Sequence, residues 1–212
     1  AVTSATSAAA FVVNANPSVE PITAPDNATF ICLPNTNTLA LSSDTPTGVW
    51  MSSNIDVATV SNVGVVTPVA EGAVIMSYTV TNPISLCATT ITYALDINAP
   101  VAIVSSTPTQ TVVTGADTSF EVLVSGTGPF TYLWEVCTDG SGVNFETVTD
   151  GGVYSGATTG ELVLNNVPAS FNEYLYQCTV TGICNFVISD LAIVLVGETG
   201  IVTQPSNQTI CD

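Results

Sequence analysis

The chain of 212 residues contains no lysine, arginine or histidine, against 17 aspartates and glutamates, which gives a formal net charge of −17. This composition excludes nucleic-acid binding through basic side chains, histidine-ligated metal sites and every catalytic relay that depends on a basic residue. Binding, scaffolding and chemistry by carboxylates alone remain. Because 17 acidic residues always allow some carboxylate pair and no aspartic-protease-like Asp-Thr-Gly motif is present, we expect no enzyme. No apolar run approaches the roughly twenty residues of a membrane-spanning helix, so we expect no membrane insertion.

The first predicted elements are a short apolar segment and a polar linker in residues 1–16, which we interpret as the end of a preceding repeat. Residues 17–99 then alternate short β-branched or aromatic segments with turn residues. That spacing predicts a β-sandwich. The strands expected in it are 39–41, 48–51, 58–60, 64–66, 74–80 and 89–97.

Residues 100–197 repeat this alternation and predict a second sandwich, and residues 198–212 predict the start of a following repeat. The fold class expected from the whole chain is all-β, with two tandem sandwiches and flanking fragments of neighbouring repeats. The strands expected in the second sandwich are 118–124, 132–136, 161–164, 174–180 and 190–196.

A short signature recurs along the chain. Its copies are Asn27-Ala-Thr-Phe-Ile-Cys32, Thr109-Gln-Thr-Val-Val113 and Asn207-Gln-Thr-Ile-Cys211. Their spacing of about 80 and then about 100 residues is the size of a β-sandwich domain. The recurrence predicts a tandem array, and the alternative is that the end segments complete domains in neighbouring copies.

The segment Trp50-Met-Ser-Ser-Asn, followed by Val57-Ala-Thr-Val-Ser61, Gly64-Val-Val-Thr67, Ala70-Glu-Gly72 and Ile75-Met-Ser-Tyr78, resembles the bacterial Ig-like group 2 domain over residues 26–97. The resemblance implies a sandwich whose core holds Trp50, Val57, Val60, Val65 and Tyr78.

The second sandwich is similar to another Ig-like repeat, found in surface proteins of Bacteroidota, over residues 100–197. Tyr132-Leu-Trp-Glu-Val136, Gly152-Val-Tyr-Ser-Gly156 and Tyr174-Leu-Tyr-Gln-Cys178 carry that likeness. It implies that Trp134 is the buried tryptophan of an Ig domain and that Tyr176 forms a tyrosine corner. The strand at 120–124 lacks the usual cysteine partner of Cys178.

Tandem arrays of both repeats resemble large adhesins of gliding Bacteroidota, which are exported by a type IX secretion system. The resemblance implies an extracellular, cell-surface stalk whose partners are neighbouring repeats of the chain or neighbouring subunits. Two other functions stay open: a filament subunit that assembles by strand addition, and a module that binds surface glycans.

The six cysteines have no metal-ligand spacing, so we expect disulfides and an oxidising compartment. One predicted pair is Cys32 with Cys87, which would close the first sandwich. The other is Cys178 with Cys184, which would span a hairpin. Cys137 could replace either member of the second pair, and Cys211 belongs to the following repeat.

Oxygen-bearing side chains in a glycine-rich turn, Asp139, Asn144 and Glu146, form a candidate calcium site, and Asp96 with Asn98 at the domain junction form another. The competing interpretations are a hairpin turn and a rigid proline linker. We expect no other cofactor. Tyr132, Phe145 and Tyr154 form a candidate ligand patch, which is the feature on which glycan binding would depend.

Overall fold

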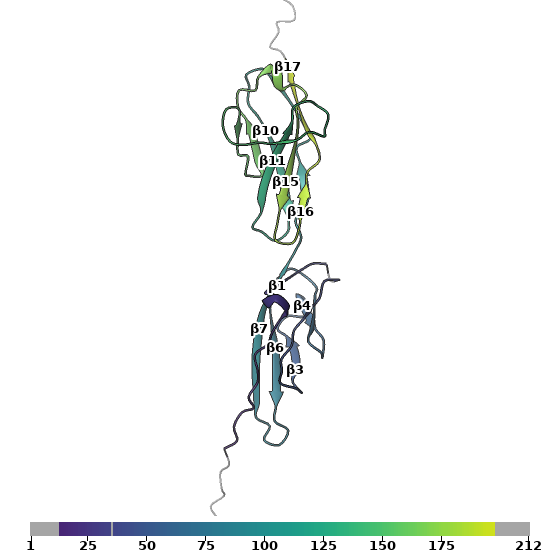
Figure 1. Cartoon of the computed structure of the whole chain (residues 1–212), viewed down its shortest axis with the longest axis vertical. Helices are drawn as coiled ribbons and strands as arrows, with labels where there is room; N and C mark the ends of the chain where they lie inside the picture. The colour runs from purple at the N-terminus through teal and green to yellow at the C-terminus, as the bar shows by residue number, and fades with distance from the viewer. Residues whose placement is uncertain (1–12, 35, 198–212) are drawn as a thin grey trace, which may run out of the picture. The chain divides into compact units, whose positions relative to one another are not determined.

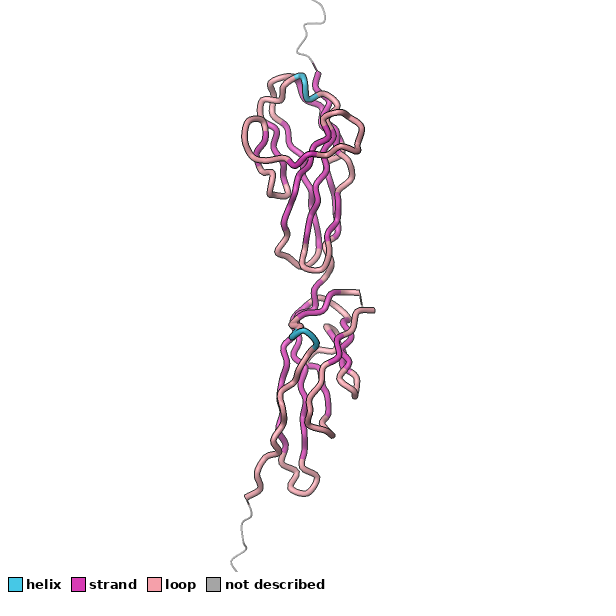
Figure 2. Tube along the Cα trace, viewed as in Figure 1, coloured by secondary structure: helices cyan, strands magenta, loops and turns pink. Residues whose placement is uncertain are grey.

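The computed structural model describes residues 13–34 and 36–197 (Figure 1). The chain divides into two compact units between Ala99 and Pro100. Within the described residues the structure is all-β, with only two short 3-10 turns, η1 (Pro25–Asn27) and η2 (Ala169–Phe171), and Figure 2 shows strands and loops almost throughout. None of the helices described has the length and apolar character needed to cross a membrane.

The first unit is a sandwich of two sheets. One sheet has the strand order β1-β7-β6-β3, and the other has the order β2-β5-β4. The strands are β1 (Phe30–Cys32), β2 (Leu39–Ala40), β3 (Val49–Ser52), β4 (Ala58–Val60), β5 (Val65–Pro68), β6 (Gly72–Thr81) and β7 (Ala88–Asn98).

Alternation along β6 explains the core of this unit, because every second side chain faces the other sheet. Tyr78 is buried in this core, and Trp50 packs against it with ring centroids 4.7 Å apart. Of the five residues predicted for this core, Tyr78 is buried, and Trp50, Val57 and Val60 are half-buried and pack against it. Val65 is half-buried and Val66 is buried in its place, since β5 has the opposite alternation phase.

The second unit is also a sandwich of two sheets. One sheet has the order β13-β14-β10-β8, and the other has the order β12-β11-β15-β17-β9 with β16 paired to β15. The strands are β8 (Ala102–Ser106), β9 (Thr109–Val113), β10 (Thr118–Ser125), β11 (Thr131–Cys137), β12 (Glu146–Thr147), β13 (Tyr154–Ser155), β14 (Glu161–Leu164), β15 (Leu175–Thr181), β16 (Phe186–Ile188) and β17 (Ala192–Gly197).

Aromatic side chains fill the centre of the second core. Trp134 is buried, and its indole N–H donates to the Thr159 carbonyl at 2.9 Å, so its polar atom is satisfied. Phe120 on β10 packs against Tyr176 on β15 with ring centroids 4.9 Å apart. These contacts join the two sheets, since β10 and β15 belong to different ones.

The recurring signature lies at the same topological position in both units. Phe30–Cys32 pairs in parallel with β7, which is the last strand of the first unit. Thr109–Val113 pairs in parallel with β17, which is the last strand of the second unit. The signature therefore marks the strand that closes one sheet of each sandwich, and its third copy, 207–211, lies outside the described residues.

Candidate interaction surface

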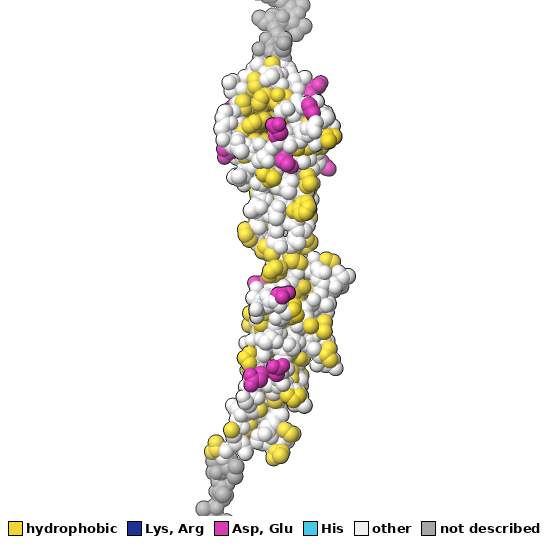
Figure 3. Space-filling view, in the orientation of Figure 1, with side chains coloured by type: hydrophobic (Ala, Val, Ile, Leu, Met, Phe, Trp, Pro, Cys, Tyr) yellow, Lys and Arg dark blue, Asp and Glu magenta, His cyan; other side chains and the backbone are white. Residues whose placement is uncertain are grey.

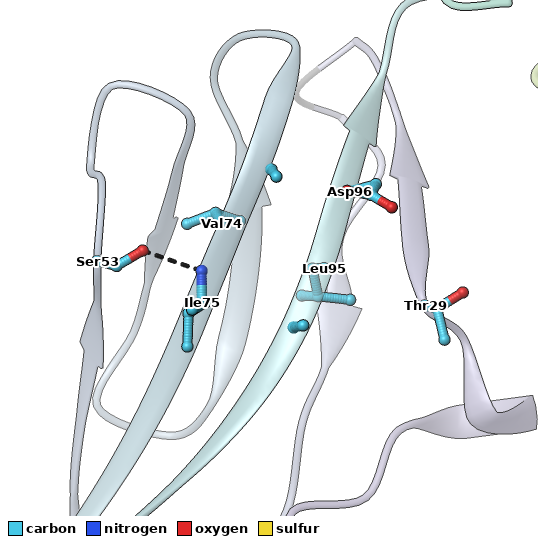
Figure 4. Close-up of a pocket in the computed structure, with 8 residues that line it drawn as sticks. Thr29, Ser53, Val74, Ile75, Leu95 and Asp96 are labelled. Carbon is cyan, nitrogen blue, oxygen red and sulfur yellow. Dashed lines mark hydrogen bonds between the residues drawn. The ribbon is translucent and has the colours of Figure 1, made fainter.

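A shallow hollow lies on the outer face of the β1-β7-β6-β3 sheet (Figure 4). Ala73 and Ala94 line it, and because their side chains are small they leave room between the larger residues around them. Ser53 lies at one side, where its hydroxyl accepts a 2.9 Å hydrogen bond from the Ile75 N–H, and Asp96 and Thr29 lie at the other. The hollow is mostly apolar, and Asp96 is the one charged side chain that lines it.

A second hollow, which we call the edge groove, lies where the two sheets of the first unit meet at their edges. Edge strand β3 and edge strand β4 form its sides. Its lining residues are Trp50, Met51, Ser52, Ile55, Thr59 and Val60. Met51 and Ile55 are 61% and 67% exposed, so much of this lining is apolar surface that faces solvent.

The backbone of β3 is open along the edge groove. The Ser53 N–H donates to the carbonyl of Ile75, the residue of β6 that lies directly opposite Ser53, so Ser53 and Ile75 form a hydrogen-bonded pair of the ladder. Hydrogen-bonded pairs alternate with non-bonded pairs along an antiparallel ladder. The N–H and C=O groups of Trp50 and Ser52 therefore point away from β6, and among the described residues no strand pairs with β3 on that side.

Charge is sparse on these surfaces, since the whole chain has 17 acidic residues and no basic ones. On the face drawn in Figure 3, the acidic side chains stand singly or in small groups among uncharged polar and hydrophobic ones. Natural edge strands commonly carry a lysine, a charge or a proline that discourages pairing with another chain. The four residues of β3 include none of these.

The structure contradicts the predicted pairing of Cys32 with Cys87. Cys87 has a free thiol and Cys32 is disulfide-bonded. Cys32 lies opposite Asn98 at one end of β7, whereas Cys87 directly precedes the other end. Ten strand residues at about 3.3 Å each separate the two ends by roughly 30 Å, far beyond the reach of a disulfide.

The predicted pairing of Cys178 with Cys184 is wrong as well. Cys178 has a free thiol and lies in the core, and Cys184 is disulfide-bonded. The backbones of Cys178 and Ser189 lie opposite each other, whereas Cys184 is in the turn between β15 and β16. The turn is several residues farther along the strand, so the two sulfur atoms are too far apart to bond. Cys137 is also free and buried.

The predicted calcium turn is closed by its own hydrogen bonds. Asp139 Oδ1 accepts from the Ser141 N–H and from the Cys137 thiol, both at 2.9 Å, and Oδ2 accepts from the Asn144 amide at 2.9 Å. The thiol, hydroxyl and amide donors lower the pKa of the Asp139 carboxyl well below its ordinary value. The turn geometry is thus explained by the protein alone, and Glu146 is on β12 outside this network.

Asp96 and Asn98, the other candidate calcium ligands, differ in their surroundings. Asp96 is exposed on β7 beside the hollow, whereas Asn98 is buried. In the parts of the chain that the structure describes, no three Asp, Glu, Cys or His side chains come together as a metal-binding group. Calcium binding stays a prediction, which a thermal shift with millimolar calcium would test.

The three aromatic residues predicted as a ligand patch do not share one surface. Tyr154 and Tyr132 are half-buried and pack against the core of the second unit. Tyr132 lies opposite Val180 on β15, whereas the Tyr154 hydroxyl contacts that of Tyr176, four residues away along the same strand. Four strand residues span roughly 13 Å, so the two tyrosines serve different parts of the sandwich. Phe145 is half-buried in the loop before β12.

No protein-family model and no curated protein matches the sequence. Among solved structures, an I-band fragment of titin matches with a TM-score of 0.55 and 13% identity, over 84% of this chain and 63% of that one. The N-terminal eight Ig domains of Down Syndrome Cell Adhesion Molecule match with a TM-score of 0.59 and 15% identity, over 86% of this chain and 25% of that one. Both units are immunoglobulin-like domains. The chain spans less than two thirds of each of these structures, and at such low identity the likeness concerns the fold alone.

The second Ig-like domain has the predicted buried Trp134 but departs from an antibody domain in two respects: the missing cysteine partner of Cys178, which was predicted, and the missing tyrosine corner, which was not. Cys178 on β15 has no cysteine facing it from β10, which contributes Phe120 and Val122 to the core instead. Burial raises the pKa of the Cys178 thiol to about 12, so it stays protonated and inert at neutral pH. Tyr176 is not a tyrosine corner, because its hydroxyl contacts the Tyr154 hydroxyl at 3.2 Å, where a corner would bond the backbone.

The edge groove was not predicted from the sequence, although the strand β3 that forms one of its sides was. One signal was available in the sequence. If Trp50 faces the core, then Val49 and Met51 in the same strand face solvent, although both are large apolar residues. Exposed large apolar residues on an uncharged edge strand indicate a contact surface. Which strand would lie at the edge, however, depends on the sheet order, and a sequence pattern does not report it.

Proposed function

We propose that this chain is a structural repeat segment of a long extracellular cell-surface adhesin or filament, in which each Ig-like domain is a stable building unit. The observation that carries the proposal is the position of the recurring signature, which closes one sheet beside the last strand in both domains. Two domains built on one scheme in succession are what a tandem array requires. The third copy of the signature, 207–211, is consistent with a further domain of the same kind.

Further features support a scaffolding role and an extracellular location. Cys32 and Cys184 are disulfide-bonded, which fits an oxidising compartment. The chain offers no basic side chain for catalysis, and the free thiols of Cys137 and Cys178 are buried. We further propose that the array belongs to a Bacteroidota-type adhesin, with a stalk role in adhesion or gliding; this part of the proposal rests on the sequence motifs in 26–97 and 100–197 alone.

The experiment is to produce residues 17–99 and 100–197 separately and compare each with the whole chain. With disulfides reduced in all three samples, we expect each fragment to give a dispersed amide NMR spectrum whose peaks coincide with those of the same domain in the whole chain. Repeat units of an array fold by themselves, since each has its own core. A fragment that is unfolded by itself would contradict the proposal.

A second candidate is a subunit that assembles with other copies by strand addition. The open backbone edge of β3 and the apolar edge groove beside it favour this candidate. Glycan binding has less support, because Tyr132 and Tyr154 pack against the core and lie apart.

A further inference from the structure

We propose that the edge groove of the first domain is a docking site for an extended strand, and that its occupant is the segment Ser7–Val13 of a second copy of this chain. The inference extends the strand-addition candidate above by naming both the acceptor and the donor. It depends on three features: an open backbone edge, an apolar groove beside it, and an uncharged apolar segment that fits both.

The acceptor offers backbone groups in the spacing that a strand needs. Trp50 and Ser52 present their N–H and C=O groups outward, two residues apart, which is the repeat of an antiparallel or parallel ladder. The edge is held rigid from behind. Tyr78 on β6 accepts from the Gly48 N–H and donates to the Thr45 carbonyl, at 2.8 and 2.7 Å, so the approach to β3 is fixed.

The groove beside this edge selects apolar side chains. Trp50, Ile55 and Val60 line it, and its polar lining groups are the hydroxyl residues Ser52 and Thr59. The Ser52 hydroxyl already donates to the Ala58 carbonyl at 2.7 Å. A strand that pairs with β3 points every second side chain to one face, so alternate apolar residues of the donor would cover the groove.

Charge distinguishes the two candidate donors, the N-terminal segment that ends at the described, exposed Val13 and the C-terminal segment 198–212. With no basic residue anywhere in the chain, an acidic segment would find no counter-charge on a second copy. Residues 198–212 contain Glu198 and Asp212, and also a proline. Residues 1–13 contain no acidic residue and no proline, and 7–13 reads Ser-Ala-Ala-Ala-Phe-Val-Val, with β-branched and aromatic residues at its end.

The path of the described chain favours a second copy over the same copy as the donor. The Asn14 carbonyl accepts from the Cys87 thiol, and the Pro17 carbonyl accepts from the Thr89 hydroxyl at 2.6 Å. Residues 14–17 therefore lie beside the end of β7 next to the β6–β7 hairpin, and β6 separates β7 from β3. To reach its own β3, the segment would have to reverse across that hairpin.

A donor on one copy and an acceptor on another give a head-to-tail contact, which can propagate into a filament. This geometry permits a complementation test with two variants of the full chain. Ile55→Asp places a charge in the groove and leaves the donor intact. Phe11→Asp places the same charge in the donor and leaves the groove intact. Ile84→Asp is the matched control, since Ile84 is 93% exposed in the same domain but lies outside the groove.

Analytical ultracentrifugation at about 1 M salt, where the Debye length is about 3 Å and repulsion between copies is screened, gives the readout. We expect the unchanged chain and Ile84→Asp to associate as concentration rises, and each of the other two variants to stay monomeric. Mixing Ile55→Asp with Phe11→Asp should restore association, and it should stop at a dimer, because only one functional donor and one functional groove then meet.

Association that survives in Ile55→Asp, or a mixture that stays monomeric, would overturn the proposal. The proposal would also be overturned if the unchanged chain is monomeric, its Trp50 and Ser52 amides are protected from hydrogen exchange, and Phe11→Asp removes that protection. The donor segment would then belong to the same copy as the groove. An unchanged chain that is monomeric with exposed amides also overturns it. That last result leaves the repeat-segment proposal standing, because its test is the folding of each domain by itself.

Discussion

Removing one hydroxyl group, in Tyr78→Phe, tests how the first domain holds the loop before β3. Tyr78 is 6% exposed, and its hydroxyl makes two hydrogen bonds, from the Gly48 N–H and to the Thr45 carbonyl. Each such bond contributes about 0.5–1.5 kcal/mol net, so the loss of both should lower the free energy of unfolding by about 1–3 kcal/mol. The ring and its contact with Trp50 are retained in the variant.

The matched control is Tyr93→Phe, because the Tyr93 hydroxyl makes a single bond, to the Ala28 carbonyl at 2.8 Å, and its side chain is half-buried. The assay is hydrogen–deuterium exchange of the β6 amides, with the β15 amides of the other domain as an internal reference. Tyr78→Phe should speed exchange in β6 by about 5- to 150-fold, which corresponds to about 1–3 kcal/mol. If Tyr93→Phe had the larger effect, the reasoning from paired hydrogen bonds would be refuted.

Three further predictions concern the two cores. Burial raises the pKa of Cys178 to about 12 and raises the pKa values of Tyr154 and Tyr176, so the folded second domain holds protons that the unfolded chain releases at high pH. The stability of this domain should therefore fall as pH rises above about 9, and a urea midpoint that is unchanged between pH 8 and pH 11 would contradict this. In the native chain at pH 8, iodoacetamide should alkylate the half-buried Cys87 and leave the buried Cys178 unmodified until denaturant is added. Peptide mass spectrometry measures this, and equal modification of both cysteines would contradict the burial of Cys178 in the core. Gly48→Ala should destabilise the first domain by about 1–3 kcal/mol, because a Cβ there would collide with the Tyr78 ring, and a thermal midpoint equal to that of the unchanged chain would show that the ring can move aside.

Much of the strand content could be predicted from the sequence, because long half-buried strands alternate clearly. The expected strand at 74–80 is the centre of β6, and that at 132–136 is the centre of β11. The strand expected at 190–196 begins two residues later, as β17 at Ala192, and the short strand β16 (Phe186–Ile188) was not predicted. Ser189 lies between β16 and β17, where its hydroxyl accepts from the Cys178 N–H and donates to the Asp190 carbonyl, and alternation in the sequence does not reveal either bond.

The candidate sites were less predictable, because they depend on register and sheet order. Cys32 and Cys87 were paired on their positions in the chain, but the parallel register of β1 on β7 places them at opposite ends of one strand. Tyr154 was taken as a surface residue because β13 has only two residues, too few for alternation to show which face is buried. The edge groove needs the knowledge that β3 ends its sheet, which only the assembled fold supplies.

The central claim is that both domains are closed by the same signature strand, paired in parallel with the last strand. Interstrand nuclear Overhauser effects in the whole chain measure this directly. We predict contacts between the backbones of Ile31 and Ile97 in the first domain, and between those of Thr111 and Leu195 in the second. Contacts in one domain only, or an antiparallel pattern in either, would contradict the account.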